Sequence, residues 1–241
     1  MTAAVTRPDT DVPAQERGRL FELAALLLTY PDPELLAARG ELSTAAGALE
    51  HRQVADAVQR FLIWFDQTPA TAIGQHYVQT FDLRRKSGLY LTYYLHGDTR
   101  KRGIALLTLK QRYRAHGLTL REGELPDLLP VVLEFAATVG PGDGEAPLRQ
   151  HRQGIELLRA ALEAVGSPYV HLLDAVCLAL PPITDADRAA IAALAVDGPP
   201  VESVGLTGPG GLTPPSPDDD DELAAIGLAP YGAAPTPFLT P

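Results

Sequence analysis

The sequence of 241 residues contains a single cysteine, Cys177. One cysteine excludes an internal disulfide framework, and it excludes a zinc or iron–sulfur site that draws several cysteines from this chain. Cys177 stands in the apolar run 176–180, where a cysteine more often packs as a small hydrophobic residue than acts as a nucleophile. The cysteine content therefore fits a reducing compartment.

Long hydrophobic runs are also missing. Charge or proline interrupts every apolar run within about 18 residues, which is short of a membrane span. The first 19 residues carry charges of both signs and no apolar run, so they do not resemble a secretory signal. These absences predict a soluble cytoplasmic protein without direct membrane insertion.

The patterns that identify enzymes are absent as well. The glycines at 103, 117 and 123 are too scattered for a nucleotide-binding loop, and no Gly-Lys-Ser/Thr sequence occurs. The histidines show no metal-ligand spacing. No nucleophile stands beside a base, and no paired carboxylates stand in an apolar setting. We therefore predict that the protein is not an enzyme, with no catalytic residue, no metal ligand and no stably bound cofactor.

Charge is present but unevenly distributed. The net charge is −10, yet residues 84–121 hold ten of the twenty Lys and Arg residues and one acid, Asp98. We call residues 84–121 the basic band. The strongly acidic remainder would repel phosphate, so the sequence does not favour a nucleic-acid partner.

Apolar residues recur at helical spacing through most of the chain, and no alternating runs joined by tight turns predict a sheet. Asp32-Pro33 and Thr68-Pro69 are typical helix starts, and Thr184 with Asp187 forms an approximate capping box. Residues 89–95 would permit a strand by propensity, but they have no partner run, so a helix is predicted. The expected helices cover residues 20–28, 33–48, 54–65, 69–81, 89–95, 99–115, 127–135, 146–165, 168–180 and 185–196.

This pattern predicts an all-α protein with a single helical bundle of about nine to ten helices. The expected domain covers residues 17–197, after a flexible N-terminus of residues 1–16. In residues 198–241, 17 of 44 residues are Gly or Pro, and residues 218–222 are all acidic. We expect this tail to be disordered or loosely docked, although residues 223–228 could form a short helix when docked.

A turn followed by three successive cations makes residues 96–103 the most unusual local sequence. In one interpretation Asp98 or Thr99 caps a helix, and the cations form its solvated first turn. In the other, the cations receive a phosphate-bearing ligand or an acidic partner surface. The residues of this candidate surface are Arg84, Arg85, His96, Asp98, Arg100, Lys101 and Arg102.

Two further groups have alternative interpretations. Residues 124–127, Glu-Leu-Pro-Asp, form either a loop with a helix cap at Asp127 or a recognition loop that presents carboxylates to a basic peptide. The tyrosines at 90, 93 and 94 are interleaved with leucines, which favours core packing over a platform for stacked bases.

Three blocks of sequence, residues 77–85, 89–103 and 124–135, closely resemble the NarJ family of nitrate reductase molybdenum-cofactor assembly chaperones. The resemblance extends over residues 17–196. It implies a helical bundle that binds the N-terminal region of the catalytic (alpha) subunit of nitrate reductase. The bundle would hold that subunit while the molybdenum cofactor is inserted, and would then dissociate.

The wider family carries a Glu-x-Pro-x-Asp-His loop near its peptide site. Glu124, Pro126 and Asp127 resemble a shortened version of it, with Leu128 where the histidine would stand. We expect an amphipathic basic peptide to lie in a groove between helices, where carboxylates meet its cations. The candidate residues for the client peptide are Tyr90, Tyr94, Glu124, Asp127 and Glu134. The basic band would face the client or its cofactor, and a general helical scaffold for an unrelated partner is the alternative function.

Overall fold

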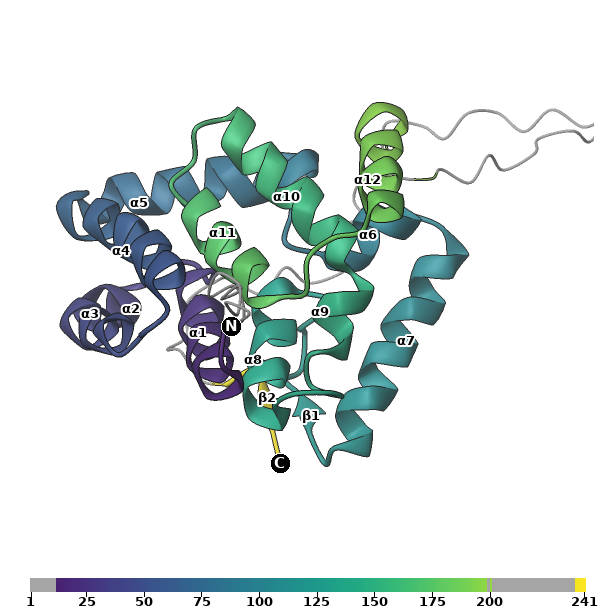
Figure 1. Ribbon diagram of the computed structural model, residues 1–241, viewed down its shortest axis with the longest axis horizontal. Helices are drawn as coiled ribbons and strands as arrows, with labels where there is room; N and C mark the ends of the chain where they lie inside the picture. Colours follow the sequence, from purple (N-terminus) through teal and green to yellow (C-terminus); the bar gives the residue numbers. More distant parts are fainter. Residues whose placement is uncertain (1–11, 199, 201–236) are drawn as a thin grey trace, which may run out of the picture.

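The computed structural model describes residues 12–198, 200 and 237–241, and twelve α-helices make up most of them (Figure 1). The helices are α1 Ala14–Leu27, α2 Pro33–Ala37, α3 Arg39–Gly47, α4 Arg52–Gln67, α5 Ala70–Tyr77, α6 Leu91–His96, α7 Arg100–Ala115, α8 Leu129–Val139, α9 Ala146–Gln150, α10 Arg152–Ala164, α11 Val170–Ala179 and α12 Asp185–Asp197. The π-helical turn η1 Val78–Asp82 and the 3-10 turn η2 Arg85–Ser87 lie between α5 and α6. The all-α prediction is confirmed.

Two of the predicted helices are each broken into two. The backbone leaves the helical region at Ala38, where ψ is 5°, and this separates α2 from α3. It does so again at His151, where ψ is 20° and the imidazole Nδ1 lies 2.9 Å from the Pro147 carbonyl oxygen. The ten expected helices are therefore twelve in the structure. The sequence does not predict the two breaks, because apolar spacing continues across both of them.

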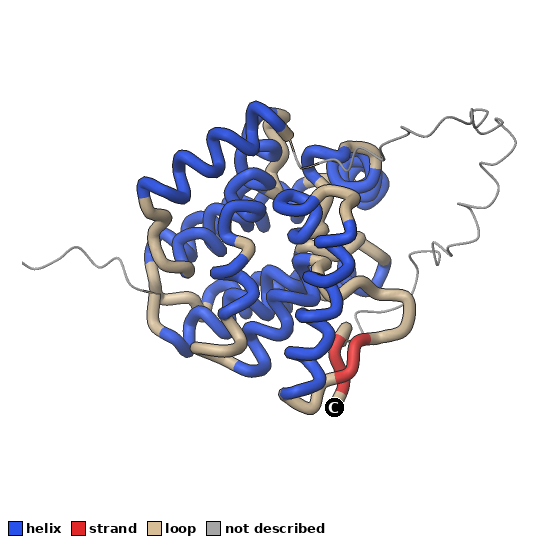
Figure 2. Tube along the Cα trace, turned by 90° about the vertical axis from the view of Figure 1, so that its right-hand side faces the viewer, coloured by secondary structure: helices blue, strands red, loops and turns tan. Residues whose placement is uncertain are grey.

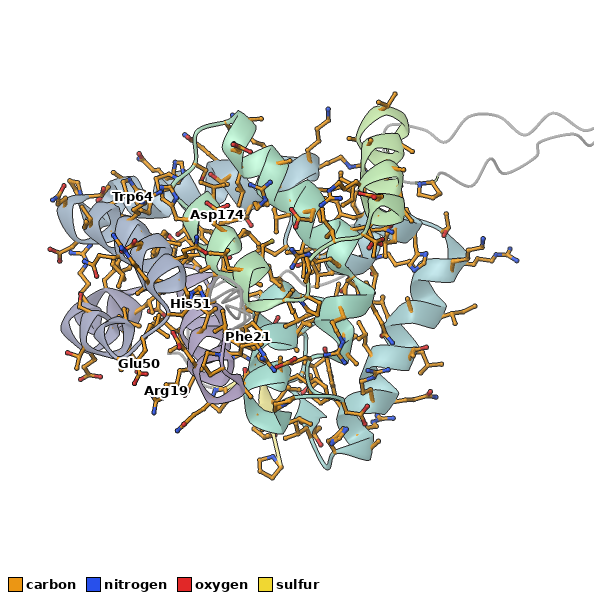
Figure 3. The ribbon with its side chains drawn as sticks, in the orientation of Figure 1. Arg19, Phe21, Glu50, His51, Trp64 and Asp174 are labelled. Carbon is orange, nitrogen blue, oxygen red and sulfur yellow. The ribbon has the colours of Figure 1, made fainter. Side chains whose placement is uncertain are left out.

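The core forms where four pairs of helices pack against each other. α1 packs along α8, α4 along α11, and α10 contacts both α11 and α6 (Figure 1). α8 is apolar around most of its circumference, and its residues Val132, Leu133 and Phe135 are fully buried, as expected of a central helix. Phe21 reaches this centre from α1 (Figure 3).

Aromatic rings fill the other end of the core. Tyr169, at the start of α11, has its ring centre 4.9 Å from that of Phe81 and 5.0 Å from that of Phe61. Trp64, which projects from α4 (Figure 3), lies 5.7 Å from the same ring. Offset and edge-on contacts of this kind add about 0.5–1.5 kcal/mol per pair to the area that is buried.

The C-terminal residues return to the body of the protein. Strand β2, Leu239–Thr240, pairs antiparallel with β1, Thr119–Leu120, with Leu120 opposite Leu239 (Figure 2). The sequence predicts no strand, and two-residue strands are too short to show the alternation on which such a prediction depends. The possible helix at residues 223–228 lies outside the described residues.

Helix α12 begins at the capping box that the sequence predicts. Thr184 and Asp187 form the capping box that opens α12, and α12 ends at Asp197 before Gly198, whose φ is 75°. In the part of the chain that the structure describes, no helix has the length and apolarity needed to cross a membrane.

A glycine sets the distance between α10 and α6. A Cβ atom added at Gly154 would lie 3.2 Å from the Leu91 carbonyl oxygen and 3.3 Å from Tyr94 Cβ. We expect Gly154→Leu to lower the free energy of unfolding by about 1–3 kcal/mol, because the larger side chain must separate the two helices. Urea denaturation would measure this change.

Gly40→Leu is the matched control for that substitution. A Cβ atom at this exposed glycine of α3 would meet nothing within 4 Å. Since leucine has the higher helix propensity, the control is expected to raise stability by up to about 1 kcal/mol. Equal effects of the two substitutions would contradict close packing at Gly154.

Candidate functional site

Asp127 lies buried at the junction of two segments that are distant in sequence. Its carboxylate Oδ2 accepts hydrogen bonds from the Thr92 backbone N–H, at 3.2 Å, and from the Thr92 hydroxyl. Its carbonyl oxygen accepts a bond from the Leu91 N–H at 3.0 Å. Leu91 and Thr92 are the first residues of α6, so Asp127 caps a helix that precedes it by 35 positions.

This arrangement corrects the prediction that Asp127 opens the next helix. α8 begins at Leu129, its N-cap residue is Leu128, and no side chain caps it. An isolated β-bridge joins Tyr90 to Leu128, and the Leu129 N–H donates to the Leu89 carbonyl oxygen at 2.8 Å. The two segments are thus held together by backbone bonds on either side of the Tyr90–Leu128 bridge, one of which Asp127 itself accepts.

Arg102 connects Asp127 to the protein surface. One guanidinium nitrogen lies 3.8 Å from Asp127 Oδ2, and Nε donates to the Thr92 hydroxyl oxygen at 3.3 Å. Another nitrogen pairs with Asp98 at 3.4 Å. The guanidinium lies 5.9 Å from the ring centres of both Tyr90 and Tyr93, which is cation–π range.

Arg85 extends this group outward. It pairs with Asp98 at 3.2 Å, and its guanidinium lies 6.0 Å from the Tyr93 ring centre. We call Arg85, Tyr90, Tyr93, Asp98 and Arg102 the arginine–tyrosine cluster. The structure therefore brings part of the predicted client-peptide set and part of the basic surface to one place.

The start of α7 carries three successive cations at the end where the helix dipole disfavours them. Thr99 occupies the N-cap position, but its hydroxyl donates to the His96 carbonyl oxygen at 2.8 Å, so neither its side chain nor that of Asp98 caps the helix. Asp98 instead offsets the positive charge through its pairs with Arg85 and Arg102. Capping therefore does not account for this segment.

The remaining predicted basic residues are placed around this helix start. Arg84, Arg100 and Lys101 are exposed, whereas His96 is half-buried. Burial and the charge of Lys101 lower the pKa of His96, which disfavours the protonated form of its ring. The exposed positive charge thus comes from the arginines and lysine.

The two tyrosines predicted to bind client peptide have different surroundings. Tyr94 is 7% exposed, and its hydroxyl lies 2.9 Å from the Gly88 carbonyl oxygen and 3.2 Å from that of Lys86, so it fixes the loop before α6. Tyr90 is 36% exposed. Burial raises the pKa of Tyr90, as do the nearby charges of Asp127 and Glu124.

Glu134 lies apart from this cluster, where α8 meets the C-terminal residues. Its two carboxylate oxygens accept hydrogen bonds from the backbone N–H groups of Phe238, at 2.8 Å, and Leu239, at 3.1 Å. Burial raises the pKa of Glu134, although these two bonds and the charge of Arg121 act in the opposite direction. We call Glu134, Arg121 and strand β1 the β1 site.

Arg121 links the β1 site to the recognition loop. Its backbone N–H donates to the Phe238 carbonyl oxygen at 2.8 Å, and its guanidinium lies 5.0 Å from the Phe238 ring centre. The guanidinium also pairs with Glu124 at 2.8 Å. All three carboxylates predicted to meet client cations therefore have partners within the chain.

Thr92, Arg121 and Phe238 are the site residues that the sequence analysis misses. Arg121 could have been noticed as the last cation of the basic band, three residues before Glu124. Nothing in the local sequence connects Thr92 with Asp127, or Phe238 with Glu134. Such contacts depend on tertiary structure alone.

Elsewhere in the described residues we find few groups suited to binding or catalysis. A pocket of about 420 Å³ between α10 and α11 is lined by Arg159, Glu163, Gly166, Ser167, Pro168, Val170, His171 and Asp174. Cys177 packs against the core, and burial raises the pKa of its thiol to about 12, so it is protonated at pH 7. No group of three potential metal ligands occurs among residues 12–198, 200 and 237–241.

Comparison with known proteins gives consistent similarities. A family model described as nitrate reductase delta subunit matches residues 45–175. The chain is 33% identical over 165 residues to the probable nitrate reductase molybdenum cofactor assembly chaperone NarJ of Bacillus subtilis, which covers 68% of this chain and 90% of that protein. It is also 33% identical over 171 residues to NarJ of Escherichia coli K12, covering 70% of this chain and 72% of that protein.

A longer relative shows higher identity. The chain is 41% identical over 174 residues to the nitrate reductase-like protein NarX of Mycobacterium tuberculosis H37Rv, which covers 70% of this chain. The matching region spans about a quarter of the NarX protein, 26% of its length.

Proposed function

This chain belongs to the nitrate reductase delta subunit family, and from that membership we propose that it is an assembly chaperone for a nitrate reductase. It binds the unfinished catalytic subunit through that subunit's N-terminal region while the molybdenum cofactor is inserted. It acts in the cytoplasm, without catalysing a reaction and without holding the cofactor stably itself.

The observation that carries this proposal is the match to the Bacillus subtilis NarJ protein. The similarity extends over 90% of that protein, which is named as a probable nitrate reductase molybdenum cofactor assembly chaperone. A match of this extent covers nearly the full length of that protein. The all-helical fold and the absence of enzyme motifs from the sequence are consistent with the same role.

The arginine–tyrosine cluster and the loop at Glu124 are the surface that we assign to the client peptide. Tyr90 offers a partly exposed aromatic ring, and Glu124 offers a carboxylate that already pairs with a guanidinium in Arg121. A basic amphipathic peptide would use both features, since its apolar side chains need an aromatic surface and its cations need acids. Asp127 and Tyr94 act here by holding the loops in place.

The exposed cations at Arg84, Arg100 and Lys101 have a separate role in this proposal. They face an acidic surface of the client or the phosphates of the cofactor that it receives. Complementary charge of this kind speeds encounter and selects the correct partner more than it adds affinity.

Calorimetric titration with a synthetic peptide from the N-terminus of the cognate catalytic subunit tests this function. We expect saturable binding that weakens between about 50 mM and 500 mM salt, because screening at the higher ionic strength weakens exposed charge pairs. Glu124→Gln is expected to weaken binding by about two- to fivefold, since an exposed pair contributes up to about 1 kcal/mol.

A scrambled peptide of the same composition serves as the control for this titration. If neither salt concentration supports binding of the native peptide, the peptide mechanism is wrong. The chaperone would then have to recognise a folded surface of its client. If the scrambled peptide binds equally well, the interaction is electrostatic attraction without sequence recognition.

A further inference from the structure

The β1 site holds the C-terminal residues chiefly through contacts with their backbone. β1 pairs with β2, and the Arg121 N–H extends this pairing to the Phe238 carbonyl oxygen. Glu134 accepts both successive N–H groups, those of Phe238 and Leu239. Contacts of this kind recognise an extended chain, whatever its sequence, in the manner of strand addition at a sheet edge.

Two side chains supply the selectivity of the β1 site. Leu239 is 5% exposed and belongs to the main hydrophobic core. Phe238 is partly buried beneath the Arg121 guanidinium. The neighbouring residues Pro237 and Thr240 are exposed. The site therefore fits an extended segment with an aromatic residue followed by leucine or a similar apolar residue.

The C-terminal residues in the β1 site contact, directly or through Arg121, two carboxylates that the sequence predicts to bind the client. Glu134 has both of its oxygens bonded to residues 238 and 239. Glu124 is paired with Arg121, whose backbone and guanidinium both contact Phe238. A client segment that used Glu134 and β1 would meet the C-terminal residues already in place.

We propose that residues 237–241 are an internal competitor that occupies the β1 site until an extended client segment displaces them. This inference rests on the proposed chaperone function, and it adds regulation to it. Because the competitor belongs to the same chain, its effective concentration is fixed and independent of protein concentration. Only a segment that binds more strongly than this intramolecular contact gains the site.

The test uses a full-length variant in which the internal contact is weakened. In Leu239→Ser a buried apolar side chain becomes polar, so the C-terminal residues should dissociate from β1. A fluorescein-labelled peptide with the sequence of residues 230–241 is then titrated against both proteins, with binding followed by anisotropy. We expect the peptide to bind Leu239→Ser at least about tenfold more tightly than it binds the wild type, in line with the loss of one buried leucine.

Two further variants make the result specific. Thr240→Ala changes an exposed side chain of the same strand and leaves its backbone pairing intact, so it should behave as the wild type. The double variant Leu239→Ser/Glu134→Ala lacks the carboxylate acceptor and should lose most of the gained affinity. Circular dichroism melting of each variant establishes that it is folded. Equal peptide affinity in the wild type and Leu239→Ser would overturn the proposal.

The client peptide gives the second measurement. We expect the catalytic-subunit peptide to bind Leu239→Ser about three- to tenfold more tightly than it binds the wild type. If both proteins bind it equally, the client uses another surface and the C-terminal residues do not compete. That result overturns this inference but leaves the chaperone function intact. If the 230–241 peptide behaves as expected and the client peptide binds neither protein, the peptide mechanism of the proposed function fails instead.

Discussion

Asp127→Ala is expected to lower the free energy of unfolding by about 3 kcal/mol. The substitution removes the acceptor for the Thr92 N–H at the start of α6 and leaves the Thr92 hydroxyl without its buried partner. It also removes the nearest buried anion from Arg102. Loss of a hydrogen bond to a buried charged group costs about 1.5–3 kcal/mol, and breaking a buried ion pair costs about 3–5 kcal/mol.

Urea denaturation followed by far-ultraviolet circular dichroism would measure this loss. Asp98→Ala is the matched control, because Asp98 pairs with Arg102 and Arg85 from a side chain that is 62% exposed. Exposed pairs are worth about 0–1 kcal/mol, so the control should stay near the wild type. Similar losses in both variants would mean that Asp127 does not hold α6 as described.

The second large effect concerns client maturation. We expect Arg100→Glu/Lys101→Glu to reduce nitrate reductase activity in cells by about tenfold, equivalent to about 1.4 kcal/mol, because like charges would then face an acidic client surface. The loss would not come from unfolding. Both residues lie in the first turn of α7, where the helix dipole favours acids over bases.

Arg52→Glu/Arg60→Glu provides the control for that experiment. These two arginines are exposed on α4, outside the basic band, and the substitution makes the same change in net charge. Reductase activity should stay close to the wild-type level in this variant. Normal activity in Arg100→Glu/Lys101→Glu would overturn the role of the basic band, while an equal loss in both variants would indicate a general effect of net charge.

Local patterns account for the parts of the fold that the sequence predicts. Asp32 accepts a bond from the Leu35 N–H at the start of α2, as its position before Pro33 predicts. α7 ends at Ala115, which is the last residue of the helix expected over residues 99–115. Gly117 has φ 74°, and the N–H groups of Gly117 and Leu118 donate back to the carbonyls of Arg114 and Tyr113. In each case the signal lies within a few residues of the structure that it sets.

The parts that could not be predicted depend on partners distant in sequence. Asp127 precedes a proline-containing helix start and therefore resembles a local cap, yet its carboxylate binds the beginning of α6. Glu134 stands in an apolar helix, and its acceptors are used by residues 104 and 105 positions later. No periodicity or capping pattern encodes such contacts, because they arise only after the helices have packed.

The distant cap on α6 also has a consequence for the order in which the chain acquires its structure. α6 has six residues, Leu91–His96, and a helix of that length is unstable in water without tertiary contacts. During synthesis it must therefore wait until residue 127 has left the ribosome. In the finished protein, the amide hydrogens of α6 should exchange with solvent together with those of residues 127–129, as one cooperative unit.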